Sequence, residues 1–159
     1  MSKPFIALLA AFAAISMIVA GCGSSDDSTD STSSSSLTKA EFLKQGNAIC
    51  AKGEKELNEE FEEFAEEENL SENKQPTEAQ LTKATEEVFL PIIKGQVEGI
   101  RDLGAPSGEE EQVEEVVTAA EEALEKGEED PASLANEKED PFAEANKLAN
   151  DYGLTKCGE

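Results

Sequence analysis

The chain has 159 residues, in which 36 Asp and Glu outnumber 13 Lys and Arg, so the formal net charge is -23 at pH 7. Such a polyanion repels phosphate backbones and anionic lipid headgroups, because binding to either depends on neutralisation by Lys and Arg. We therefore expect no nucleic acid among its partners. The length is that of about one small domain.

The first 21 residues are typical of a signal peptide. A short N-terminal region carries Lys3, and residues 5–19, FIALLAAFAAISMIV, form an apolar run. This run is shorter than the ~20 residues that a comfortable membrane span needs, and it ends in small residues rather than in a basic flank. The sequence therefore predicts a leader that is removed from the mature protein.

The leader ends in the tetrapeptide Val19-Ala20-Gly21-Cys22. An aliphatic residue and two small residues before a cysteine resemble the lipobox of bacterial lipoproteins. The resemblance implies that the Cys22 thiol receives a diacylglycerol and becomes the new N-terminus, which would leave the protein outside the cytoplasm and anchored to the cell membrane. Two or three acyl chains, at ~0.8 kcal/mol per buried methylene, hold such a protein on the membrane almost permanently. The alternative is an ordinary secretory leader that leaves the cysteine unmodified.

Residues 22–36 consist of Cys22 and the segment GSSDDSTDSTSSSS. This segment has almost no apolar side chain to bury and cannot repay the entropy of ordering, so we expect a disordered tether before a domain of residues 37–159. Three aspartates in it superficially resemble a calcium loop, but the glycine and the closing glutamate of that pattern are missing.

A first helix is predicted for residues 38–68. Thr38 and Glu41 form a capping box at its start. Apolar or small residues then recur in steps of three and four, which places them on one helix face. These residues are Phe42, Gly46, Ile49, Cys50, Gly53, Leu57, Phe61 and Phe64.

A second helix is predicted for residues 77–103, with a capping signal at Thr77 and an end at Gly104. Pro91 lies inside this helix. Proline removes a backbone donor and clashes with the preceding turn, so we expect a kink or a break near residues 88–90.

Two further helices complete the predicted fold. The third begins at Ser107 and closes at Gly127, and the fourth begins at Asp140, followed by proline, and closes at Gly153. Strand patterns are nearly absent from residue 37 onward. Four helices with short connections predict an all-α fold, a four-helix antiparallel bundle.

With Cys22 assigned to lipid, Cys50 and Cys157 remain as an even pair in an oxidising compartment. A disulfide between them would close a loop of roughly 100 residues and contribute about 4.7 kcal/mol to stability. Two buried free thiols or a redox-active pair are the alternatives, although catalytic dithiols usually lie close together in sequence. Two cysteines without a histidine do not complete a metal site.

Glutamates dominate residues 58–68 and 109–117. They fall mostly opposite the apolar stripe, which is typical of a solvated helix face, and the alternative is weak binding of cations or of a basic partner. The chain has no histidine, and it contains no Gly-x-Ser-x-Gly elbow, Ser-x-x-Lys pair or phosphate loop. We expect no enzymatic activity and no cofactor.

Two smaller features lie in the second predicted helix. Arg101 is the single arginine, and we expect it to pair with Asp102 or with an acid across the bundle; a ligand-anchoring role is the alternative. Gly95 and Gly99 favour close packing of this helix against another.

Residues 37–53, LTKAEFLKQGNAICAKG, and 140–158, DPFAEANKLANDYGLTKCG, resemble small extracytoplasmic lipoproteins of high-GC Gram-positive bacteria. The resemblance implies a helical fold and a disulfide from the first helix to the C-terminus, and nothing about mechanism. The sequence thus favours a lipid-anchored, non-enzymatic cell-envelope protein with a binding or structural role towards another envelope component. The alternative is a module that binds a small ligand or a cation, using a cavity near the kinked helix and its glycines.

Overall fold

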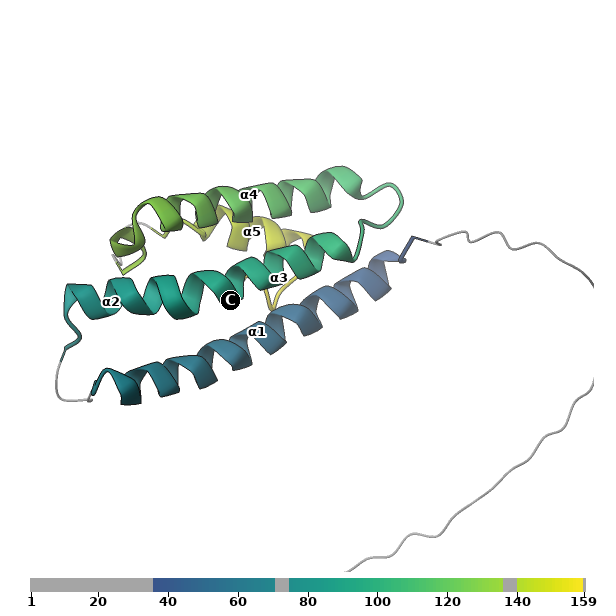
Figure 1. Cartoon of the computed structure of the whole chain (residues 1–159). Coiled ribbons are helices and arrows are strands. Elements are labelled where there is room, and N and C mark those ends of the chain that lie inside the picture. The colour runs from purple at the N-terminus through teal and green to yellow at the C-terminus, as the bar shows by residue number, and fades with distance from the viewer. Residues whose placement is uncertain (1–35, 71–74, 136–139, 159) are drawn as a thin grey trace, which may run out of the picture. The chain divides into compact units, whose positions relative to one another are not determined.

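The computed structural model describes residues 36–70, 75–135 and 140–158 (Figure 1). The predicted signal peptide, Cys22 and all of the predicted tether except Ser36 lie outside the described residues. Within the described ranges every regular element is a helix and no strand is present, which confirms the predicted all-helical class.

Helix α1 (Lys39–Glu67) begins at the predicted capping box. The backbone N–H of Glu41 donates to the Thr38 hydroxyl over 3.3 Å, and the Glu41 carboxylate accepts from the Thr38 backbone N–H over 3.0 Å. Hydrogen bonds from the side chain and the backbone of Thr38 hold the pKa of Glu41 below its usual range. The start of α1 therefore satisfies two of the donors that a helix N-terminus leaves free.

The predicted apolar stripe of α1 is buried along most of its length, but Phe61 is 47% exposed. The prediction for this residue was wrong because Phe64, about 60° further round the helix, occupies the interface instead. Phe64 packs in a small cluster with Ala84 and Val88 of the following helical segment. Phe61 stacks on the Phe64 ring from outside, with 6.4 Å between ring centroids.

The next helical stretch contains α2 (Glu78–Ala84), a π-helical turn, η1 (Thr85–Phe89), and α3 (Leu90–Asp102). The backbone N–H of Leu90 donates to the carbonyl oxygen of Thr85, five residues earlier. Pro91 cannot donate, and the wider π turn in front of it makes room for its ring. The irregularity predicted near residues 88–90 is thus a π turn, and the chain stays helical on both sides of it (Figure 1).

Helix α4 (Glu110–Glu129) differs from the prediction at both ends. Ser107 is not its cap, because Gly108 has a φ of 83° and cannot belong to a right-handed helix; the Ser107 hydroxyl lies 2.7 Å from that of Ser36 instead. Gly127 does not end the helix either. It lies buried inside α4, where an added Cβ would lie 2.8 Å from Leu134. Leu134 belongs to the short 3-10 helix η2 (Pro131–Ala135), which packs on α4.

Helix α5 (Ala143–Tyr152) begins later than predicted. The Asp140 carboxylate accepts from the Phe142 backbone N–H over 2.9 Å, so Asp140 closes a turn in front of the helix rather than capping it. The predicted end is confirmed. Gly153 has a φ of 112°, and Leu154 folds back so that its N–H donates to the Ala149 carbonyl oxygen over 2.8 Å.

The main core lies between α1, α3, α4 and α5, with Phe42 and Leu154 as its largest fully buried side chains. The Phe42 ring meets the Tyr152 ring edge to face, with 5.9 Å between centroids. Gly99 packs closely against Ile49 of α1 as predicted, whereas the α carbon of Gly95 faces open space. If α2, η1 and α3 are counted as one continuous helix, the described residues contain four main helices: α1, the α2–η1–α3 segment, α4 and α5.

Candidate functional site

A cavity of about 240 Å³ lies within the main core, next to the π turn. Phe89, the last residue of that turn, contributes to its wall. Most of the lining is apolar and comes from α1, α3, α4 and α5, as with Leu57, Ile93, Val117 and Ala149. π turns occur often beside functional sites, where they redirect side chains. The packing of four elements around one apolar space makes this the candidate site.

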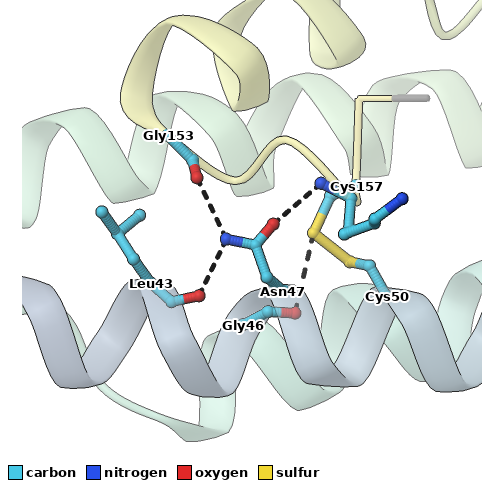
Figure 2. The surroundings of a disulfide bond; sticks show 7 residues. Leu43, Gly46, Asn47, Cys50, Gly153 and Cys157 are labelled. Carbon is cyan, nitrogen blue, oxygen red and sulfur yellow. Dashed lines mark hydrogen bonds between the residues drawn. A yellow bond between two sulfur atoms is a disulfide. The ribbon is translucent and has the colours of Figure 1, made fainter.

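Cys50 and Cys157 line the same cavity, and their sulfur atoms lie 2.07 Å apart, which is disulfide distance (Figure 2). Their α carbons are 5.1 Å apart. Cys50 lies in the middle of α1 and is 2% exposed, whereas Cys157 lies in the segment after α5. The structure therefore brings together the two cysteines that the sequence paired, and adds that the pair forms part of the cavity wall.

Asn47 fastens the segment of residues 153–158 to α1, one turn before Cys50 (Figure 2). Its amide nitrogen donates to the carbonyl oxygen of Leu43 over 2.9 Å and to that of Gly153 over 3.0 Å. Its amide oxygen accepts from the backbone N–H of Lys156 over 2.8 Å. Leu154, Lys156 and Cys157 all line the cavity, so Asn47 holds one of its walls in place.

Gln96 on α3 and Asn146 on α5, which carry side-chain amides, also line the cavity. Both residues are half-buried. Within the described part of the chain neither side-chain amide has a hydrogen-bond partner. Two amide groups from different helices are therefore free to bind a polar group in the cavity.

Gln96 owes its position to Gly53 of α1. An added Cβ at residue 53 would overlap the Gln96 amide, so the glycine leaves room for this side chain between α1 and α3. The charged residues of the lining are Glu54 and Lys156, one of each sign, and both are exposed. The cavity is thus apolar inside, with amides and a balanced pair of charges among its polar residues.

A second group of interacting side chains joins the beginnings of α1 and α4 to the end of α5. Lys39 pairs with Glu109 over 2.7 Å, and its ammonium group lies 4.4 Å from the centre of the Tyr152 ring. Burial and the nearby Glu109 carboxylate raise the pKa of Tyr152 to about 12. These contacts are structural, because they tie three helices together at one end of the domain.

The glutamate runs lie mainly on exposed helix faces, as expected of a solvated surface. Several pair with lysines, such as Glu59 with Lys55 over 3.1 Å. Arg101 pairs with Glu121 of α4, across the helices as predicted. Among the residues that the structure describes, no three Cys, Asp or Glu side chains are grouped as metal ligands, and no helix has the length and hydropathy needed to span a bilayer.

The site combines predicted and unpredicted residues. Cys50 and Cys157 were singled out from the sequence, and Cys22 lies outside the described residues. Asn47, Gln96 and Asn146 were missed, because a single amide carries no local pattern that separates a binding group from a solvated one. Gly53, one of two glycines on the stripe of α1, was a signal that a neighbouring side chain needed room.

Comparison with models of protein families, with curated proteins and with solved structures finds no match to this chain.

Proposed function

We propose that this chain is a lipid-anchored, extracytoplasmic protein whose helical domain binds a small apolar ligand and catalyses no reaction. The observation that carries the binding role is the apolar cavity of about 240 Å³ in the core. We take the helices to form an antiparallel four-helix bundle, which the short connections and the packing of α1 on α3, α3 on α4 and α4 on α5 support.

The volume of the cavity favours a ligand. Protein cores are close-packed and have few voids larger than a water molecule. The cavity of about 240 Å³ is partly open to solvent, so its apolar walls are in contact with water. An apolar molecule that displaces this water buries those walls, which is favourable by ~25 cal/mol per Å² of apolar surface.

The size of the ligand follows from a comparison. An apolar cavity of about 150 Å³ binds one benzene molecule, which has six carbon atoms. By proportion, a cavity of about 240 Å³ accommodates roughly ten non-hydrogen atoms. Naphthalene, with ten carbon atoms and no polar group, is therefore a suitable probe.

The binding role is tested by thermal denaturation of the full chain carrying Cys22→Ser, which cannot be acylated. At a naphthalene concentration ten times Kd, mass action stabilises the folded state by about 1.4 kcal/mol, which raises Tm by several degrees. Ala145→Leu places a larger side chain in the cavity wall and should abolish the increase. Ala143→Leu makes the same change at an exposed position of α5 and should preserve it. An unchanged Tm for the Cys22→Ser chain at saturating naphthalene would rule out this role.

The location at the membrane is supported by the leader and by the tetrapeptide ending in Cys22. A disulfide between Cys50 and Cys157 agrees with an oxidising compartment. The test is intact-mass analysis of the mature protein from its native host, which should begin at Cys22 and carry acyl chains. Cys22→Ser should move the protein from the membrane fraction into the soluble fraction. An unacylated N-terminus on the natural chain would contradict the proposal.

A second candidate function is docking to another component of the envelope. One observation favours it, the exposure of Phe61 on α1 among glutamates. Crosslinking on intact cells tests this function, and Phe61→Ser should remove a specific crosslink that Glu63→Ser keeps.

A further inference from the structure

We infer that the ligand of the cavity is an uncharged molecule with a single hydroxyl or amide group, which Gln96 and Asn146 bind while its apolar part fills the core. This inference rests on the proposed binding role and specifies the chemistry of the ligand. It is carried by two half-buried amides that line the cavity from α3 and α5 and have no hydrogen-bond partner within the described residues.

The apolar walls exclude a charged ligand group from the interior. Val97, Val116 and Val117 are buried and line the cavity, and none of them can solvate a charge. Transfer of an unpaired ion into such surroundings is far more costly than transfer of a hydroxyl or an amide that keeps a hydrogen bond.

The charged residues of the lining give a second reason why the cavity does not favour a charged ligand. Glu54 and Lys156 contribute one negative and one positive charge, so the lining carries no excess that would select an ion of either sign. The protein as a whole has a net charge of -23, which raises the free energy of any approaching anion. Carboxylate ligands such as fatty acids are therefore disfavoured at long range and inside the cavity.

The two amides supply what an uncharged polar group needs. Each has a carbonyl oxygen that accepts and an NH₂ group that donates, so the pair can satisfy both the donor and the acceptor of a hydroxyl or a primary amide. Because residue 53 is a glycine, the Gln96 side chain has room between α1 and α3.

The test compares ligands of similar size in the full chain carrying Cys22→Ser, by isothermal titration calorimetry at pH 7. The series is 1-octanol, octanamide, octanoate, octylammonium and ethylbenzene, which have eight to ten non-hydrogen atoms. We expect 1-octanol and octanamide to bind at least ten-fold more tightly than octanoate and octylammonium. Equal or tighter binding of either ion would overturn the inference, and this comparison does not depend on the folding of any variant.

Substitutions assign the polar contact. Gln96→Leu and Asn146→Leu should each weaken octanamide binding about five-fold, the effect of one lost hydrogen bond, and leave ethylbenzene binding unchanged within two-fold. Gln45→Leu, at an exposed position of α1 outside the cavity, is the matched control and should change neither. Undiminished octanamide binding in both variants would overturn the inference. If ethylbenzene binds and the uncharged polar ligands show no advantage over the ions, the inference fails and the binding role stands; if no ligand of the series or naphthalene binds, both fail.

Discussion

The Asn47 side chain of α1 donates a hydrogen bond over 3.0 Å to the carbonyl oxygen of Gly153, which lies 106 residues later in the chain (Figure 2). The same side chain accepts from the Lys156 backbone N–H over 2.8 Å. One amide thus satisfies two backbone groups of the C-terminal segment, directly beside the Cys50–Cys157 pair. This segment forms one wall of the cavity, so its attachment bears on both stability and binding.

Asn47→Ala should destabilise the domain by about 1 to 3 kcal/mol, because it removes the partly buried hydrogen bond to the Gly153 carbonyl oxygen and the exposed one from the Lys156 backbone N–H. Urea denaturation followed by circular dichroism measures the change. Asn58→Ala is the matched control, since the Asn58 amide bonds only to the Glu54 carbonyl oxygen in its own helix. A loss no larger than that of the control would show that Asn47 does not hold the C-terminal segment.

Reduction of the Cys50–Cys157 pair should lower the stability by about 4 to 5 kcal/mol, because the open chain regains the entropy of a loop of roughly 100 residues. Thermal melts with and without a reductant should then differ by more than 10 °C, at about 3 to 6 °C per kcal/mol for a domain of this size. The double variant Cys50→Ser, Cys157→Ser is the control and should not respond to the reductant. Identical melts of the natural sequence under both conditions would mean that no disulfide forms.

Gly53→Ala and Gly95→Ala should have different effects on stability. An added Cβ at residue 53 overlaps the Gln96 amide and must displace it, whereas a Cβ at residue 95 meets no atom within 4 Å. Both glycines lie inside helices. Gly95→Ala should therefore stabilise the domain by about 0.4 to 1 kcal/mol through helix propensity and the unfolded chain.

Gly53→Ala should instead leave the stability unchanged or lower, and it should weaken ligand binding as Gln96 moves. Urea denaturation and calorimetric titration with octanamide check the two effects. A gain in stability equal to that of Gly95→Ala, with binding intact, would show that the contact between residues 53 and 96 is unimportant.

Tyr152 should make the domain less stable at high pH. Its pKa is 10.0 in an unperturbed chain and about 12 in the folded protein, where burial and then Glu109 disfavour the phenolate. Between these values the unfolded state loses the proton and the folded state keeps it, so stability is full below pH 10 and falls as the pH rises towards 12. The loss should reach roughly 2 to 3 kcal/mol, at about 1.4 kcal/mol per pKa unit.

The measurement is urea denaturation between pH 9 and pH 12. Tyr152→Phe removes the titrating group and keeps the ring that packs on Phe42, so its stability should depend less on pH over this range. Parallel pH profiles for the two proteins would contradict the assignment to Tyr152.

Predictions from the sequence succeeded where the signal is local. The capping boxes at Thr38 and Thr77 and the left-handed end at Gly153 depend on residues within one or two helical turns. Pro91 likewise marked the position of an irregularity, although not its form. A proline permits a kink, a break or a π turn. The structure has a π turn, and Val88 within it and Leu90 directly after it both pack in the core.

Predictions failed where distant residues decide the outcome. Gly127 resembles a helix end in sequence, yet α4 continues through it, and a glycine is needed there because Leu134 of η2 and Leu90 of α3 leave no room for a side chain. Phe61 follows the apolar period of α1 and is nevertheless exposed, since α1 meets the following helix through Phe64.

The sequence by itself determined the helical class, most helix ends, the acidic surface and the pair of cysteines, because each depends on periodicity, capping or composition along a short stretch. The tertiary structure alone decided that Gln96 and Asn146, 50 residues apart, line one cavity beside the Cys50–Cys157 pair. The position of a cavity depends on how the helices pack, and that packing follows from close contacts between side chains that no local pattern encodes.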